Sequence, residues 1–327
     1  MKVDERTRGK LEKFKNAPPH KKAIRYVAYL TLCSLIKGLR VIPRSCCRVL
    51  GRNIASVVYL FEKKNKNRAL MNLNELKLPE SLAKKSFQHF GEVTFETLKN
   101  YHSHRTEILK LVDAHEGYDL FKQELTIKKK GLVILTGHFG NFELVASHMA
   151  QYFPLNTIAN MAIDPRMNNL IYKLRTKHGL RVWPQNTDSQ TILNCLAKNE
   201  VFAFLVDMDM PWTKGVFVSF FNRPCYTVIA PTILALRSGS TLAVGFAARI
   251  ANKYQGLAET VDLERTDDLR RDLVINTQKW TSVFEKYIRQ FPEQWLWMQE
   301  RWKTKPRDKP AVYEESKKYL QEIGITI

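Results

Sequence analysis

The sequence "GLVILTGHFGNFELVASH" at residues 131–148 joins an uncharged apolar run to a helix-like stretch through a short turn. Residues 131–136 are typical of a buried strand because the run is short, apolar and free of charge. Two glycines permit a sharp turn after it, and Asn141 is a favourable N-cap residue. Glu143 then falls in the first helical turn, where the helix dipole favours a carboxylate. The segment therefore predicts a strand, a tight turn and a helix in direct succession.

The same alternation of strand-like and helix-like stretches continues along the chain. Such alternation predicts crossover connections and an α/β fold, in which helices cover both faces of a mixed, largely parallel sheet. The expected strands are residues 131–136, 155–163, 180–184, 201–207 and 241–249, and the expected helices are residues 141–153, 166–178, 187–198 and 228–238. Ahead of them, residues 79–111 are mostly helical in pattern, because apolar residues recur at three-and-four spacing.

Polar side chains stand at or near the ends of three expected strands. They are His138, Asp207, Asp209 and Asn160. In open α/β sheets, ligands bind beyond the carboxyl ends of the strands. We therefore expect these side chains to converge on one site.

His138 and Glu143 can cooperate only if the histidine precedes the helix, because residues five apart on a continuous helix point about 140° apart. The turn satisfies this condition. A carboxylate could then hold one imidazole N–H and leave the other nitrogen free as a general base. The spacing equally fits a turn histidine bonded to the backbone, with Glu143 serving only the helix dipole, so the residues alone leave both interpretations open.

Other chemistries are disfavoured. His138, Glu143 and His148 lack the order of a zinc-binding H-E-x-x-H helix, no G-x-S-x-G nucleophile motif is present, and the turn lacks the lysine of a P-loop. An H-x-H pair, His102 and His104, has no cysteine or third histidine nearby and is expected in a solvated loop. These patterns predict no metal site.

Length and composition predict one large domain. At 327 residues and 44% hydrophobic composition, the chain can bury a large core. Three tryptophans near the C-terminus, Trp295, Trp297 and Trp302, are expected to pack in that core. The five cysteines form no paired C-x-x-C motifs and are expected to be reduced in the cytosol.

Positive charge is concentrated near the amino terminus. The net charge is +20, and residues 1–68 hold 18 basic and 4 acidic residues, which places +14 in this segment. Such a skew indicates an anionic partner, either a membrane surface, a nucleic acid or an acidic protein. Nucleic acid is disfavoured because no zinc-finger spacing or RNP-like aromatic motif accompanies the charge.

Two apolar runs in this segment, residues 26–36 and 54–61, are flanked by arginines and lysines. The longer run would extend about 16 Å as a helix, roughly half of a bilayer core. The pattern predicts helices that lie in a membrane interface, although a basic helical cap on the main domain also fits. We expect a membrane-association region at residues 1–68, a main domain at 69–310 and a C-terminal helix or tail at 311–327.

Several motifs together resemble a known family. "GHFGNFE" at residues 137–143 is similar to the H-x-x-x-x-[D/E] signature of the glycerolipid and lysophospholipid acyltransferases, and it most resembles the form found in lipid A late acyltransferases. Further motifs similar to that family's follow in the same order: "NNLIYKLRTKHG", "LVDMD", "GVFVSFFNRP", "ILALRSGS" and "PEQWLWMQERWKTKP". This order favours the catalytic interpretation of His138 and Glu143.

The resemblance implies an acyltransferase that moves a fatty acyl chain from acyl carrier protein to a hydroxyl of a lipid A precursor, at the cytoplasmic face of the bacterial inner membrane. It implies that His138 removes the proton from the acceptor hydroxyl and that Glu143 orients His138. Direct transfer from a thioester needs no protein nucleophile, and no cofactor or metal is expected. The basic amino terminus suits both an anionic lipid and an acidic carrier protein.

The resemblance also implies roles on the substrate side for Asn141, Arg175, Asp207, Asp209 and Arg223. Arg175 is expected to meet an anionic group of the donor or acceptor, since guanidinium binds such groups bidentately. The two aspartates are expected to support the site or contact a sugar hydroxyl, and Arg223 to lie near the acyl or phosphate group. Structural salt bridges at strand ends are the alternative for these charges.

Three substitutions depart from the family pattern, and the family's arginine-proline ahead of its N-N-P stretch is absent, with Arg166 after the proline instead. Phe142 replaces the usual tryptophan, Met208 replaces glutamine and Ser219 replaces proline. These changes bear on acceptor and chain-length specificity and leave His138 and Glu143 intact. Two other functions remain open: an acyltransferase of the same superfamily that acts on another phospholipid or glycolipid, and a non-catalytic protein that binds membrane surfaces.

Overall fold

A computed structural model describes residue 9, residues 12–160 and residues 162–327 of the chain. The strands are β1 (Val112–Asp113), β2 (Leu132–Thr136), β3 (Leu155–Ala159), β4 (Arg181–Pro184), β5 (Val201–Leu205), β6 (Gly215–Phe220), β7 (Arg223–Val228), β8 (Thr241–Ile250) and β9 (Lys253–Val261). The helices are α2 (Pro19–Leu39), α3 (Arg44–Phe61), α4 (Lys63–Glu75), α5 (Ser81–Asn100), α6 (Arg105–Leu109), α7 (His115–Lys128), α8 (Phe142–Met149), α9 (Pro165–Thr176), α10 (Ser189–Ala197), α11 (Ala230–Ser238), α12 (Leu269–Gln290) and α13 (Pro310–Glu322), with short 3-10 helices η1 (Pro292–Gln294) and η2 (Pro306–Asp308).

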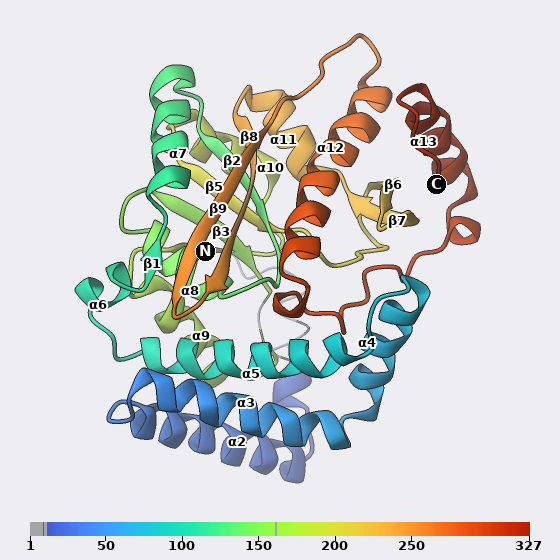
Figure 1. The fold of residues 1–327 in the computed structure, drawn as a ribbon. Coiled ribbons are helices and arrows are strands. Elements are labelled where there is room, and N and C mark those ends of the chain that lie inside the picture. The colour runs from blue at the N-terminus through green and yellow to red at the C-terminus, as the bar shows by residue number, and fades with distance from the viewer. Residues whose placement is uncertain (1–8, 10–11, 161) are drawn as a thin grey trace.

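Seven strands of the described chain form the central sheet, in the order β1-β9-β8-β2-β5-β3-β4 (Figure 1). β2 pairs in parallel with both β8 and β5, and β3 pairs in parallel with β5 and β4. Only the β8–β9 pair within this described sheet is antiparallel. The predicted α/β fold with a mixed, largely parallel sheet is confirmed.

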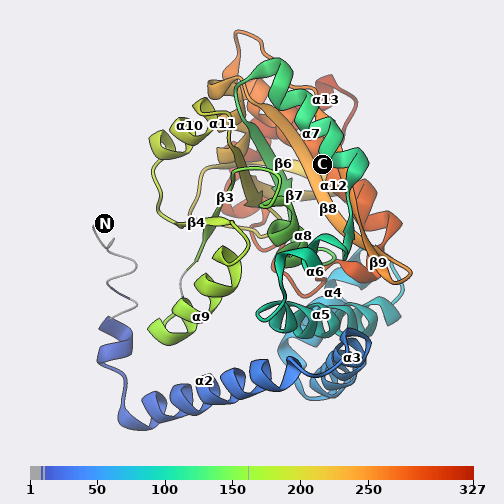
Figure 2. The same ribbon diagram turned by 90° about the vertical axis from the view of Figure 1, so that its left-hand side faces the viewer.

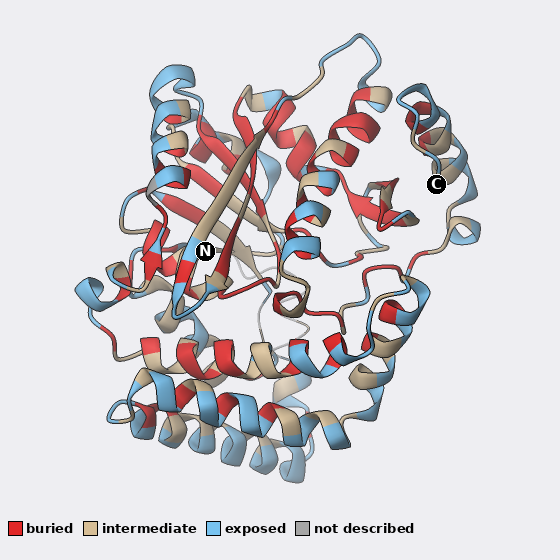
Figure 3. Cartoon of the chain, in the orientation of Figure 1, coloured by how far each residue is buried: buried red, intermediate tan, exposed pale blue. Residues whose placement is uncertain are grey.

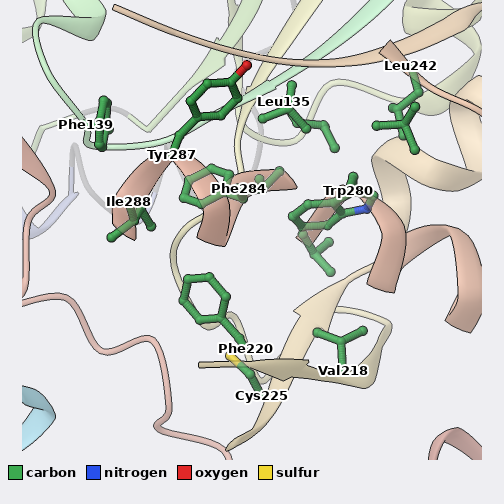
Figure 4. Close-up of a cluster of buried hydrophobic side chains, with 14 of the residues drawn as sticks. Leu135, Phe139, Val218, Phe220, Cys225, Leu242, Trp280, Phe284, Tyr287 and Ile288 are labelled. Carbon is green, nitrogen blue, oxygen red and sulfur yellow. The ribbon is translucent and has the colours of Figure 1, made fainter. Parts of the chain in front are cut away.

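Helices cover both faces of the sheet, and the side chains of β2 are buried on both faces. Its side chains alternate between the faces, as in any strand. Ile134 belongs to the buried cluster that includes residues of α7 and α8, whereas Leu135 belongs to the cluster on the other face with Trp280 and Phe284 of α12 (Figure 4). A strand buried on both sides cannot carry charge, which explains its uncharged sequence.

The expected elements differ from the observed ones in a few places. The strand expected at residues 155–163 ends at Ala159, and the helical pattern at 79–111 divides into α5 and α6. β9, α12 and the antiparallel β6–β7 pair were not anticipated from the sequence. The expectation for the three tryptophans is confirmed, because Trp295, Trp297 and Trp302 are all buried.

The amino-terminal segment forms two long helices on one side of the molecule. Figures 1 and 2 show α2 and α3 at the outer side of α5. The buried side of α3 carries Cys47, Gly51 and Ala55, four residues apart, and so faces one direction. Gly51 lies so close to Gly91 of α5 that a Cβ on either glycine would overlap the other's carbonyl oxygen.

The outward side of these helices is largely exposed (Figure 3), and many of its exposed side chains are apolar. Its exposed residues are Ile24, Tyr26, Val27 and Leu30 of α2, Val41 of the connecting turn, and Val49, Leu50, Ile54, Val57, Val58, Leu60 and Phe61 of α3. Among the described helices, none has the length and hydropathy to cross a bilayer. We call the exposed apolar residues of α2, α3 and their connecting turn the apolar face.

Candidate active site

The turn between β2 and α8 has the predicted construction. Gly140 has a positive φ of 54°, and a Cβ there would overlap the backbone carbonyl of Ala247, so both conformation and space require glycine. Asn141 caps α8, because its Oδ1 accepts a hydrogen bond from the backbone nitrogen of Leu144 at 3.0 Å. His138 therefore stands before the helix and Glu143 in its first turn, as expected.

Asp207, not Glu143, holds the imidazole. His138 Nδ1 lies 3.0 Å from Asp207 Oδ1, and the backbone nitrogen of His138 donates to Asp207 Oδ2 at 2.7 Å. The indole Nε1 of Trp295 donates to the same Oδ2 at 3.1 Å. These contacts correct the sequence-based expectation that Glu143 would orient His138. The carboxylate bonded to the ring belongs to Asp207, which follows β5, the strand paired with β2.

Glu143 is instead the partner of Arg175, in the last turn of α9. Arg175 Nε lies 3.0 Å and 3.1 Å from the two carboxylate oxygens of Glu143, and Nη2 contacts Oε1 as well. In this structure Arg175 therefore forms a salt bridge within the protein, which is the alternative to the expected contact with a substrate anion. The pair links α8 to α9 beside the histidine.

These contacts set the charge state of the site. Burial lowers the pKa of His138, but the charge and hydrogen bond of Asp207, together with the charge of Glu143, outweigh burial and raise the pKa above its ordinary value. Burial raises the pKa of Asp207, yet His138 and Trp295 outweigh it, so the pKa is lowered. Asp207 is therefore ionised, and it stabilises the protonated imidazole.

A cavity of about 780 Å³ adjoins these residues, and His138, Glu143 and Arg175 form part of its wall. Most of the remaining wall is apolar. One part comes from α7, α8 and the sheet, including Phe121, Met149, Leu155 and Ala203; another comes from the segment after β5 and from α11, including Met208, Met210, Trp212 and Ile233. The site can therefore place a long apolar group beside an oriented histidine.

The predicted convergence of strand ends is confirmed in part. Asn160 lines the cavity together with His138, and Asp207 lies directly behind the histidine. Asp209 points elsewhere: it is buried and accepts hydrogen bonds from the backbone nitrogen and Oγ1 of Thr304 at 2.7 Å and 2.9 Å.

Two further predicted site residues also make contacts away from the cavity wall. Asn141 is fully buried and serves as the α8 cap. Arg223 forms an ion pair with Glu75 and lies 5.0 Å from the ring centroid of Trp302. In this structure Asn141, Asp209 and Arg223 have structural contacts, which matches the salt-bridge alternative for Arg223.

Two residues of the site were missed from the sequence. Thr136 lines the cavity, and its buried Oγ1 has no hydrogen-bond partner within the described chain. Its place at the end of β2, two residues before His138, was a signal that could have identified it. Trp295 supports Asp207 across 88 residues of sequence, and no local pattern marks such a contact. No cluster of three or more potential metal ligands occurs in the described part of the chain.

An oriented histidine on the wall of a large apolar cavity, at the end of a parallel strand of an α/β sheet, is typical of an enzyme site for a substrate with an apolar chain. The chain belongs to the family of bacterial lipid A biosynthesis acyltransferases, whose model matches residues 14–304. The resemblance seen in the sequence motifs is thereby confirmed, and the protein is an acyltransferase of lipid A biosynthesis at the level of its family.

Curated relatives support the same assignment. The chain is 25% identical over 279 residues to a lipid A biosynthesis palmitoleoyltransferase of Escherichia coli K12, covering 81% of this chain and 87% of that protein. It is 28% identical over 196 residues to a lipid A biosynthesis lauroyltransferase of the same organism, covering 58% and 62% of the two chains. A lipid A biosynthesis acyltransferase of Haemophilus influenzae is 24% identical over 322 residues, covering 93% of this chain and 100% of that protein.

Proposed function

We propose that the protein transfers a fatty acyl chain from acyl carrier protein to a hydroxyl of a lipid A precursor, with His138 as the general base. The observation that carries this proposal is the contact between His138 Nδ1 and Asp207 Oδ1 at 3.0 Å, on the wall of the apolar cavity. With Nδ1 held by a carboxylate, Nε2 is the nitrogen available to accept a proton.

The proposed reaction uses this geometry. Nε2 of His138 takes the proton of the acceptor hydroxyl while its oxygen attacks the thioester carbonyl. The tetrahedral intermediate then collapses, the carbon–sulfur bond breaks, and the leaving thiolate receives the proton from His138. The products are an ester and the free thiol of the carrier. Asp207 stabilises the imidazolium that forms between the two proton transfers, and general-base catalysis of this kind contributes about 10²- to 10⁴-fold.

Glu143 and Arg175 have a supporting role in this proposal. Their ion pair places a negative and a positive charge beside His138, and the two act on its pKa in opposite directions. The guanidinium also reaches the cavity wall, where an anionic group of the donor or acceptor would meet it.

The cavity suits the acyl chain. Its volume of about 780 Å³ falls within the range of about 300–1,000 Å³ typical of sites for small ligands. Apolar walls stabilise a fatty chain by removing it from water, at ~25 cal/mol per Å² of apolar surface.

We propose that the apolar face of α2 and α3 lies in the cytoplasmic leaflet of the inner membrane. Large apolar side chains are exposed there, including Leu60 at 62% and Phe61 at 77%, and residues 1–68 carry +14 of the net charge of +20. Apolar insertion and attraction to anionic lipids would act together. The alternative of a basic helical cap is compatible with the buried side of α3 and leaves the outer apolar face unexplained.

The membrane proposal is tested with liposome flotation. Leu60→Glu on the apolar face should reduce binding to anionic liposomes, because a carboxylate there opposes both insertion and surface attraction. Ile127→Glu is the matched control, since Ile127 is 66% exposed on α7, away from the apolar face. Equal binding of the Leu60 variant and the control would contradict the proposal.

The catalytic proposal is tested with purified full-length protein, a lipid A precursor and acyl carrier protein thioester, with mass spectrometry of the lipid product. We expect one added acyl chain, and His138→Ala should lower the rate by ~10²- to 10⁴-fold. Acyl-coenzyme A in place of the carrier thioester tests the donor. A product found only with a glycerophospholipid acceptor would contradict the lipid A assignment, and unchanged turnover by the His138 variant would contradict the mechanism.

A further inference from the structure

A second cavity, of about 470 Å³, lies where the turn between α2 and α3 meets the end of α5 and α6. It shares no lining residue with the cavity of His138. Its wall contains four cationic side chains, Arg40, Arg44, Lys99 and Lys110, and one carboxylate, Glu107. The proposed acyl transfer uses none of them.

Arg44 has unsatisfied hydrogen-bonding capacity in this cavity. Its Nη2 donates to Ser103 Oγ at 3.4 Å, whereas its Nη1 is buried without a hydrogen-bond partner in the described structure. Burial lowers the pKa of Arg44, while the charges of Glu96 and Glu107 act against this effect. A buried guanidinium nitrogen without a hydrogen-bond partner is costly, and an anion that entered the cavity would supply one for Nη1.

Each of the two carboxylates near Arg44 accepts a hydrogen bond from another residue. Glu96 accepts a hydrogen bond from the hydroxyl of Tyr254, and Glu107 accepts one from the backbone nitrogen of His104 at 3.2 Å. His102, from the predicted solvated H-x-H loop, also lines the cavity, and its buried Nε2 has no partner among the described residues. The cavity therefore presents several donors and few free acceptors.

The cavity is held in shape by Lys99. Its Nζ donates to the backbone carbonyls of Leu39 and Ile42, at 3.1 Å and 2.6 Å, and so fixes the turn between α2 and α3 against α5. Lys99 still adds positive charge to the wall. A site that is formed before its ligand arrives loses less conformational entropy on binding.

We propose that this cavity binds a phosphate group. An arginine fork and nearby ammonium groups are the partners that phosphate oxygens prefer. The phosphate could arrive as a free anion or as a lipid headgroup. Val41, between Arg40 and Arg44 in sequence, is 84% exposed and continues the apolar face to this turn, which favours the lipid headgroup.

The test uses the full-length protein and two probes: inorganic phosphate, measured by calorimetry, and phosphatidylcholine vesicles with or without phosphatidic acid, measured by flotation. The variant Arg44→Gln/Lys110→Gln removes two charges from the cavity. The matched control Arg270→Gln/Lys122→Gln removes two charges from α12 and α7, where both side chains are exposed. Lys110→Gln alone, at an exposed position, serves if the double variant does not fold.

We expect at least a tenfold loss of phosphate affinity in the cavity variant and none in the control. If the cavity variant binds inorganic phosphate more weakly than the control does, the site takes the free anion. If the cavity variant is weakened only in its binding of phosphatidic acid vesicles, the site takes a lipid headgroup. Equal binding by the cavity and control variants for both probes, or no phosphate-dependent binding by the wild type, would overturn the proposal. Both assays are independent of turnover, so their outcome is separate from that of the acyl transfer test.

Discussion

Asp207 receives two hydrogen bonds from one residue, His138: the backbone nitrogen donates to Oδ2 at 2.7 Å, and ring Nδ1 lies 3.0 Å from Oδ1. The two residues are 69 positions apart, in the segments that follow the adjacent parallel strands β2 and β5. The double contact fixes both the position of the turn and the orientation of the ring. The sheet therefore supplies the orientation that a neighbour in sequence was expected to give.

Asp207→Asn should lower the rate of acyl transfer by ~10²- to 10⁴-fold without large loss of stability. The amide could present its N–H to Nδ1 and so stabilise the ring tautomer that carries its proton on Nε2, which cannot act as a base. The rate is measured with carrier thioester and lipid acceptor. Asp119→Asn, an exposed substitution on α7, is the control and should behave as the wild type. A similar loss in both variants would indicate that the effect is unrelated to His138.

The pH dependence of acyl transfer should respond in opposite directions to the two members of the Glu143–Arg175 pair. The base acts when neutral, so the rate falls as the pH drops through the raised pKa of His138. Glu143 raises this pKa and Arg175 lowers it. Glu143→Gln should therefore move the acidic limb of the rate profile to lower pH, and Arg175→Gln should move it to higher pH.

The measurement is the rate of acyl transfer at saturating substrate between pH 5 and 9, compared as ratios to each variant's own maximum. This normalisation separates the pKa effect from a general loss of activity. If the acidic limbs of the Glu143 and Arg175 variants moved in the same direction, the assigned electrostatic roles of these two residues would be contradicted.

The turn around His138 was predictable because its determinants are local. The uncharged run that becomes β2, the glycine at 140 and the cap by Asn141 each follow from neighbouring residues and from φ or hydrogen-bond requirements. The family motifs, which follow one another in the same order in this chain, indicated the other candidate site residues. Identifying Asp207, rather than Glu143, as the partner of the His138 ring required the strand order, because the β2–β5 pairing brings residues that are distant in sequence together.

Helix α12 buries polar side chains beside its apolar ones, and apolar spacing does not predict the burial of the polar residues. Asn276 is fully buried and bonds to the backbone of Glu264 on both sides of its amide, at 2.8 Å each. Gln278 likewise bonds to the backbone nitrogen and carbonyl of Ser219, at 2.7 Å and 3.1 Å. From sequence alone, such polar residues are expected at the surface. Their burial is possible only because tertiary partners satisfy their hydrogen bonds.

Gly51→Ala should destabilise the protein through the contact between α3 and α5. The new methyl group would meet the carbonyl of Gly91, and backbone atoms can yield only by moving the helices apart. Overpacking of this kind costs typically ~1–3 kcal/mol in the free energy of unfolding. Urea unfolding followed by circular dichroism measures the change.

Gly38→Ala is the matched control for this change, because it also replaces a helical glycine and has open space around the new methyl group. It should leave stability unchanged or raise it by up to ~1 kcal/mol, since alanine is the better helix former. If both variants lost the same free energy, close packing at Gly51 would not be the cause.

Two substitutions in the apolar wall of the cavity should change the preferred acyl length in opposite directions. Ala203 of β5 and Met149 of α8 both line the cavity. Ala203→Leu adds side-chain volume and should favour shorter chains, whereas Met149→Ala removes volume and should favour longer ones. Each change also affects packing, so unfolding is measured in parallel, with an expected cost of ~1–3 kcal/mol for the larger residue and ~2–5 kcal/mol for the smaller one.

Chain preference is read by competition between carrier thioesters of increasing length, with mass spectrometry of the acylated lipid. The ratio of products is insensitive to a shared loss of activity. An unchanged preference in both folded variants would show that the acyl chain does not occupy this part of the cavity. Since one extra methylene in an apolar pocket is worth only ~1–3 kcal/mol in discrimination, we expect shifts of about 10- to 200-fold between chains that do and do not fit.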